Sequence, residues 1–181
     1  MPTYFIGFLT PLRKFDVYIE DPYKPIPLDQ RHLTLVYLGY LKNSEKLDLC
    51  YRIGEGLDFK AIRVVFASLG VFPSYRKPRY LAALPELKDV DKLLLLRRRL
   101  EEFFKEYIKD KYEEFKPHVS IAYTKSKADL ELQEKAAKIV KKCRGVEESL
   151  ILDKLYLFKA EKGSISPISV INRRSNRTGN D

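Results

Sequence analysis

The chain contains two histidines, and each is followed two residues later by a hydroxyl side chain. His32 precedes Thr34, and His118 precedes Ser120. Imidazoles titrate near neutral pH, so a pair of them can serve as general acid and general base. Hydroxyls beside them can donate hydrogen bonds to a phosphate as charge develops on it. These four residues are therefore the predicted catalytic group, and phosphate-ester chemistry is the reaction class they suit.

The two motifs also repeat in their flanking residues. Arg31–Tyr37 reads RHLTLVY and Pro117–Tyr123 reads PHVSIAY. In a strand, residues i and i+2 point to the same face, so each His and its hydroxyl project together while the aliphatic residues point into the core. If the two strands face each other, four polar groups meet in one cleft. The alternative is that each His is only a structural residue on a half-exposed strand. The presence of two matched motifs that contain both histidines argues against this alternative.

The elements around these motifs predict an α+β protein. Residues 4–9, 33–38, 61–69, 80–84, 119–123, 150–158 and 165–171 have the character of strands. Helices are expected from about 43 or 44 to 54 or 56, from 90 to 108 with Asp89 as N-cap, and from 129 to 143. Many links are too short for parallel crossovers, so the sheets should be largely antiparallel. We expect one domain over residues 1–172 and a polar tail over 173–181.

Composition limits the classes of function. The net charge of +9 favours polyanionic partners such as nucleic acid. The two cysteines, Cys50 and Cys143, lie far apart and are expected to be free, buried thiols. With two histidines as well, a zinc site is not expected, and we predict neither metal nor cofactor. No apolar run approaches the roughly 18 residues of a membrane span, and no signal peptide is recognised, so we expect a cytoplasmic protein.

On these motifs the chain resembles the 2H phosphoesterase superfamily, whose signature is two His-x-Thr/Ser-x tetrads. Within it, the chain is most similar to the RNA 2′,3′-cyclic phosphodiesterases, also called 2′-5′ RNA ligase-like proteins. The similarity extends to the opening YFIGFLTP, to Leu38-Gly39 after the first tetrad, and to the middle segments GVFP and PRYL. It departs at Tyr123, where the family often has an arginine, and in the Pro-rich segment before His32, where the family usually has a helix.

The resemblance implies a bilobal, pseudo-two-fold fold with two facing sheets and helices packed outside. It also implies metal-independent hydrolysis of RNA 2′,3′-cyclic phosphate ends to 2′-phosphates, with one His as base and the other as acid. The sequence leaves those roles open, with a slight preference for His118 as base. The expected partner is RNA, for example tRNA fragments, and the protein is expected to be a monomer. The predicted substrate-binding residues are Arg31, Arg79, Tyr123, Lys125 and Phe8.

The sequence alone leaves other assignments of residues and of function open. Arg76, Lys77 and Tyr75 are further candidates for RNA contacts, whereas Arg97, Arg98 and Arg99 are expected to form a solvated helix face. The same site could run in reverse as a 2′-5′ RNA ligase, or act on a small cyclic nucleotide. A non-catalytic RNA-binding module with this fold is the alternative from another class, and the two intact tetrads argue against it.

Overall fold

The structure is a computed structural model that describes residues 1–108 and 114–171. All strand pairs in the described residues are antiparallel, in the order β7-β4-β5-β6-β3-β1-β8-β9, with β2 beside β6. The strands are β1 (Thr3–Leu9), β2 (Lys24–Pro25), β3 (His32–Gly39), β4 (Ile62–Ser74), β5 (Lys77–Pro85), β6 (Val119–Tyr123), β7 (Glu148–Leu152), β8 (Leu155–Glu161) and β9 (Ser164–Val170).

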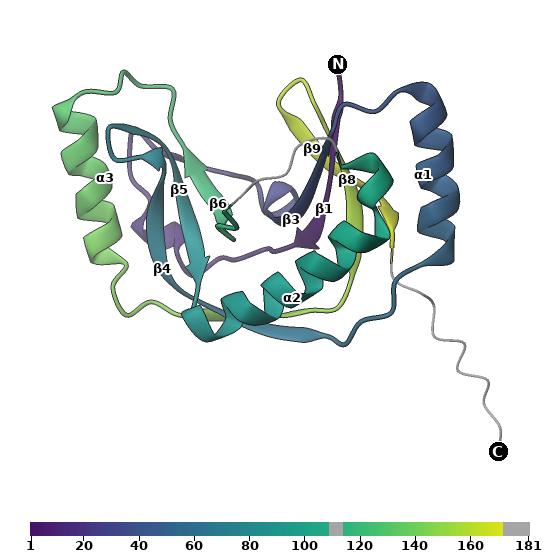
Figure 1. The fold of residues 1–181 in the computed structure, drawn as a ribbon. Coiled ribbons are helices and arrows are strands. Elements are labelled where there is room, and N and C mark those ends of the chain that lie inside the picture. The colour runs from purple at the N-terminus through teal and green to yellow at the C-terminus, as the bar shows by residue number, and fades with distance from the viewer. Residues whose placement is uncertain (109–113, 172–181) are drawn as a thin grey trace.

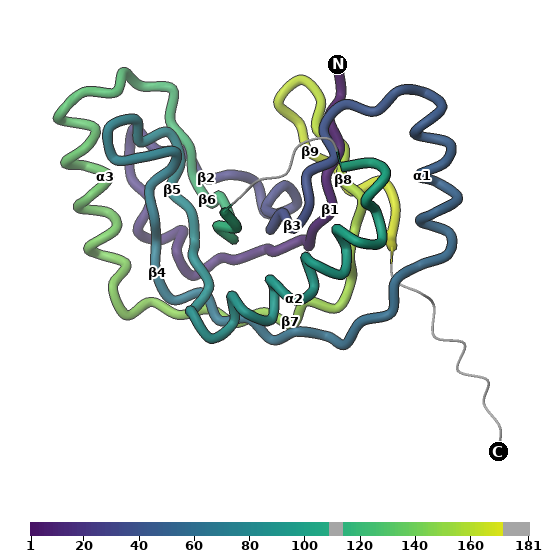
Figure 2. Tube along the Cα trace, in the orientation of Figure 1, coloured from purple at the N-terminus to yellow at the C-terminus, as the bar shows by residue number. Residues whose placement is uncertain are grey.

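Two half-sheets meet at the centre of this order. Strands β7, β4, β5 and β6 belong to one lobe, and β3, β1, β8 and β9 belong to the other. They are joined between β3 and β6, where Leu33 pairs with Val119. In Figure 2 the halves form the two arms of a wide V. The predicted bilobal α+β fold is confirmed. The structure adds that the β3–β6 pair joins the two half-sheets into one sheet.

Three α-helices cover the outside of the described fold. α3 (Leu130–Lys142) packs on β4 and β5, and α1 (Asn43–Glu55) lies on the outer side of the opposite lobe (Figure 1). α2 (Leu87–Phe103) crosses the base of the V and contacts both β3 and β4. Short 3-10 turns lie at η1 (Asp16–Tyr18), η2 (Leu28–Gln30) and η3 (Lys105–Tyr107). None of the described helices has the length and apolar character needed to cross a membrane.

The amphipathic patterns in the sequence explain why these elements form. On α2, Leu93, Leu96 and Leu100 lie at helical spacing and are at most 4% exposed. Burying each such side chain contributes about 1.5–3 kcal/mol. The helix predicted from residue 129 to 143 is α3, and Asp129 caps its first turn, where the carboxylate accepts a hydrogen bond from the Leu132 N–H at 3.0 Å.

The single strand predicted over residues 150–158 is wrong. The structure has two strands there, with β7 pairing to β4 in one lobe and β8 pairing to β1 in the other. The break falls at Asp153 and Lys154, which are both exposed. These two charged residues carry the chain across from one lobe to the other, so a continuous strand is impossible.

Three predictions around α2 also need correction. The helix ends at Phe103 and has Glu86 at its N-cap position. Asp89 is instead buried in the first turn, where its carboxylate accepts the Val65 N–H at 2.8 Å and pairs with Lys92 at 2.7 Å. Arg97 is not part of a solvated face, because it is 9% exposed and lies 4.9 Å over the Phe115 ring.

Two smaller outcomes concern the cysteines and the tail. Cys143 is buried as predicted, and burial raises the pKa of its thiol to about 11. Cys50 is exposed on α1, contrary to the prediction. The predicted tail over residues 173–181 lies outside the described residues.

Candidate active site

The junction between the lobes brings the two tetrads together. Because β3 and β6 are antiparallel and Leu33 lies opposite Val119, the same register places His32 opposite Ser120 and Thr34 opposite His118. Directly opposed side chains have Cβ atoms about 4.5–5.5 Å apart, and diagonal neighbours about 7–8 Å. Each imidazole therefore lies beside the hydroxyl of the other tetrad, and the two imidazoles are diagonal neighbours.

The apolar residues of the tetrads anchor this arrangement from the opposite face. Leu33, Val119 and Ile121 are fully buried, and Leu35 is 3% exposed. The four polar residues are partly exposed on the other face. The predicted alternation of core and polar positions is thus confirmed in both strands, so a shift of one residue in either register would bury the polar group.

Both imidazole rings are held in the same way by the backbone. His32 Nδ1 lies 2.7 Å from the carbonyl oxygen of Gln30, and His118 Nδ1 lies 2.8 Å from that of Lys116. A carbonyl oxygen only accepts hydrogen bonds, so Nδ1 carries the proton and donates it in each case. Nε2 is then the nitrogen that can take or give a proton, and both rings present it in the same tautomer.

Aromatic neighbours restrict the rotation of both rings. Phe72 stacks on His118 with ring centroids 4.3 Å apart and an angle of 17° between the planes. On the other side, Phe5 lies 4.8 Å and Phe158 5.7 Å from the His32 ring. The carbonyl contact and the aromatic packing together fix each imidazole in position and tautomer.

The surroundings of His32 shift the pKa of its imidazole. Burial lowers the pKa of His32 below its ordinary value of 6.5, and the nearby His118 lowers it further, while the hydrogen bond to Gln30 acts in the opposite direction. His32 is therefore mostly neutral near pH 7, which suits a group that accepts a proton.

A cavity of about 380 Å³ adjoins the second tetrad. Thr34, His118 and Phe72 line it on the strand side, and Arg97 and Phe115 line it on another side. Its volume is in the range of small-ligand sites. In the part of the chain that the structure describes, no three His, Cys, Asp or Glu side chains gather where they could hold a metal ion.

Two of the predicted substrate-binding residues are not available to a ligand. Phe8 is 1% exposed and packs in the core against Phe59. Arg31 is also 1% exposed. Its guanidinium donates to the carbonyl oxygens of Leu12 and Ile26 and forms an ion pair with Asp16 at 2.8 Å. Arg31 thus holds the irregular segment before β3 in place, and both residues are structural.

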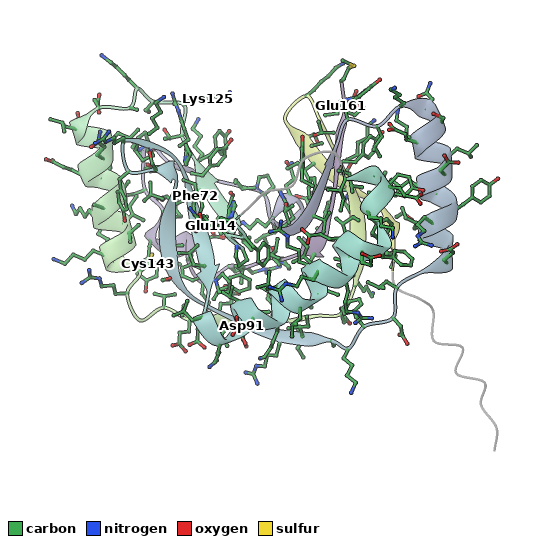
Figure 3. The ribbon with its side chains drawn as sticks, viewed as in Figure 1. Phe72, Asp91, Glu114, Lys125, Cys143 and Glu161 are labelled. Carbon is green, nitrogen blue, oxygen red and sulfur yellow. The ribbon has the colours of Figure 1, made fainter. Side chains whose placement is uncertain are left out.

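The other predicted contacts lie on the lobe that carries α3. Arg79 is partly buried and donates to the Ser126 carbonyl at 2.7 Å. Tyr123 and Lys125 line a second cavity, of about 480 Å³, together with Lys24. Lys125 lies at the rim of this lobe, across from Glu161 on the other (Figure 3). A role for Arg79, Tyr123 and Lys125 in binding stays a prediction.

Sequence reasoning missed the groups that orient the imidazoles. Gln30 and Lys116 act through backbone carbonyls, which carry no residue preference that a sequence could reveal. Phe5 and Phe72 are two of many aromatic residues, and strand pairing decides which of them reach a histidine. The one available signal was position, since both carbonyls lie two residues before a His.

Comparisons with known proteins bear on the family and the fold of the chain. The profile of the 2′-5′ RNA ligase superfamily matches residues 8–164. A comparison with curated protein sequences finds no significant match. Among solved structures, TT0787 of Thermus thermophilus is 20% identical with a TM-score of 0.66, covering 93% of this chain and 96% of that one. Escherichia coli LigT complexed with ATP is 16% identical with a TM-score of 0.63, covering 96% of this chain and 100% of that one. These likenesses establish a shared fold.

Proposed function

This chain belongs to the 2′-5′ RNA ligase superfamily, and from that premise we propose that it hydrolyses 2′,3′-cyclic phosphate ends of RNA to 2′-phosphates. The observation that carries the proposal is the pairing of Leu33 with Val119, which brings the two tetrads together on neighbouring strands. Both rings are held in one tautomer with Nε2 free of the backbone contact. That arrangement suits in-line displacement at phosphorus, where one group takes a proton and another gives one.

The proposed reaction uses water as the nucleophile. One imidazole Nε2 accepts a proton from water as its oxygen bonds to phosphorus, and the other imidazolium gives a proton to the departing ribose 3′ oxygen. The hydroxyls of Thr34 and Ser120 donate to the phosphate oxygens, which gain charge in the transition state. The product carries a 2′-phosphate and a 3′-hydroxyl.

The environment of His32 supports a particular division of roles. A base must be neutral before the reaction, and the lowered pKa of His32 favours that state. His118 would then supply the proton to the leaving oxygen. This assignment is the reverse of the slight preference drawn from the sequence.

The neighbouring structures offer indirect support. Escherichia coli LigT has been crystallised with ATP, NADP⁺, 3′-AMP and phosphate. That protein therefore binds ligands that carry phosphate groups. In this chain the same class of ligand would meet the tetrads. We expect the substrate to be an RNA end, such as that of a tRNA fragment, and the enzyme to act as a cytoplasmic monomer without a metal.

Ligation is the second candidate, favoured by the description of the superfamily. The same two imidazoles would activate the 5′-hydroxyl of a second RNA in place of water, and a 2′-5′ bond would form as the cyclic phosphate opens. Water is always present in excess at an exposed site, which favours hydrolysis.

Product analysis tests the proposal and separates the two reactions. The wild-type protein is incubated in excess EDTA with a nucleoside 2′,3′-cyclic phosphate, and separately with an RNA ending in that group plus a 5′-hydroxyl RNA. The expected product, identified by phosphorus NMR, is the 2′-phosphate. A joined RNA as the main product would favour ligation, and activity that requires an added divalent ion would contradict the metal-free mechanism.

A further inference from the structure

A row of three aromatic side chains and one lysine crosses four neighbouring strands of one lobe. Phe72 on β4 pairs with Tyr80 on β5, and Tyr80 pairs with Tyr123 on β6. Tyr123 in turn pairs with Lys24 on β2. Directly opposed residues share a face of the sheet, so these four form a continuous line, called here the aromatic row.

The aromatic row lies on the same face as the second tetrad. Ala82 on β5 pairs with Ser120, and Tyr80 is two residues from Ala82, so Tyr80 and Ser120 share a face. The register shifts between them, because Leu81, the residue before Ala82, pairs with Ala122 rather than with Ile121. This bulge turns Tyr123, three residues after Ser120, to the face that carries Ser120.

The row is partly exposed, and it connects the tetrad with a basic rim formed by Lys24 and Lys125. At one end Phe72 stacks on His118. In the middle, Tyr80 is 44% exposed. At the far end, Lys24 and Tyr123 open onto the cavity of about 480 Å³ that Lys125 and Asp21 also line.

We propose that the aromatic row binds single-stranded RNA by stacking the bases that precede the cyclic phosphate, with Lys24 contacting the phosphate backbone. This inference rests on the proposed function and deepens it, because it makes a polymer the substrate. Aromatic side chains on a sheet stack unpaired bases of any sequence, and a lysine beside them meets the backbone charge. The bases of a duplex are already stacked on each other, so the row discriminates against duplex ends.

Binding measurements test the row independently of turnover. Fluorescence anisotropy with a labelled five-nucleotide single-stranded RNA gives Kd for the wild type and for Tyr80→Ala, Tyr80→Phe and Tyr51→Ala. Tyr51 is the matched control, since it is 73% exposed but lies on α1 in the other lobe. Tyr80→Ala should weaken binding about five- to hundred-fold, the range for one lost base–aromatic stack. Tyr80→Phe and Tyr51→Ala should bind within about twofold of the wild type, because neither removes a ring from the row.

A salt titration of the same RNA separates stacking from charge. Lys24→Ala should lower the slope of log Kd against log salt by about 1, the amount expected for the loss of one phosphate contact. Tyr80→Ala should leave that slope unchanged. Equal Kd values for the folded Tyr80→Ala and Tyr51→Ala proteins would overturn the proposal. Because no step needs hydrolysis, an inactive protein that showed the Tyr80 effect would refute the proposed function and leave the row standing.

Discussion

At the scale of single residues, the proposed mechanism gives Thr34 and Ser120 the same role in opposite tetrads. In the register set by Leu33 and Val119, each lies opposite the imidazole of the other strand, where it can donate one hydrogen bond to a charged phosphate oxygen. Such a bond is worth about 1.5–3 kcal/mol, so Thr34→Ala and Ser120→Ala should each lower kcat/KM about ten- to hundred-fold. Thr34→Ser is the control and should stay near wild type. A Thr34→Ala enzyme with unchanged kcat/KM would show that this hydroxyl does not touch the phosphate.

The pH dependence of kcat/KM follows from His32. Its pKa is lowered below 6.5 by burial, and as the proposed base it must be neutral. Activity should therefore be retained as pH falls to 6.5 and be lost only below it, when His32 becomes protonated. The measurement is a kcat/KM profile from about pH 4.5 to 8. If activity instead rises as pH falls below 6.5, His32 acts in its protonated form and the assignment of roles is reversed.

At the scale of elements, Arg31 shows how the site depends on a segment without regular structure. Its buried guanidinium holds two carbonyls and Asp16, and Gln30 next to it orients His32. Arg31→Met should lower the free energy of unfolding by about 3–5 kcal/mol, because it leaves a carboxylate and two carbonyls without their partner. Urea denaturation measures this, with the exposed Arg98→Met as control, expected within about 0.5 kcal/mol of wild type. A similar small effect for both variants would mean that Arg31 is not a structural anchor.

The elements also show what a sequence can and cannot predict. β6 and α3 were predicted closely because their apolar periodicity is undisturbed and Asp129 marks a helix start. The tetrads were found because strand periodicity alone puts each His and hydroxyl on one face. By contrast, Arg31 lies beside a motif and Phe8 was expected to contact the substrate, yet both are buried, and Asp89 looks like a cap and is a buried anchor. Those outcomes depend on contacts between segments far apart in the chain, which leave no local pattern.

At the scale of the whole molecule, the charge of +9 should govern RNA affinity. Phosphate contacts from basic residues release counterions, so the affinity for single-stranded RNA should fall about tenfold or more between roughly 50 and 200 mM salt. Fluorescence anisotropy over a salt series measures this. A flat dependence would indicate that the natural substrate is a small cyclic nucleotide rather than a polymer.

The central claim is that two imidazoles, one from each lobe, act on a single transition state. The most direct test is steady-state turnover of a nucleoside 2′,3′-cyclic phosphate in excess EDTA by the wild type, His32→Ala, His118→Ala and the double variant, with circular dichroism to verify folding. Each single variant should lose about a hundred- to ten-thousand-fold, the range for general acid or base catalysis. The double variant should be little worse than the poorer single one, because the two groups act together. A folded His118→Ala protein that kept more than about a tenth of wild-type turnover would contradict the two-histidine mechanism.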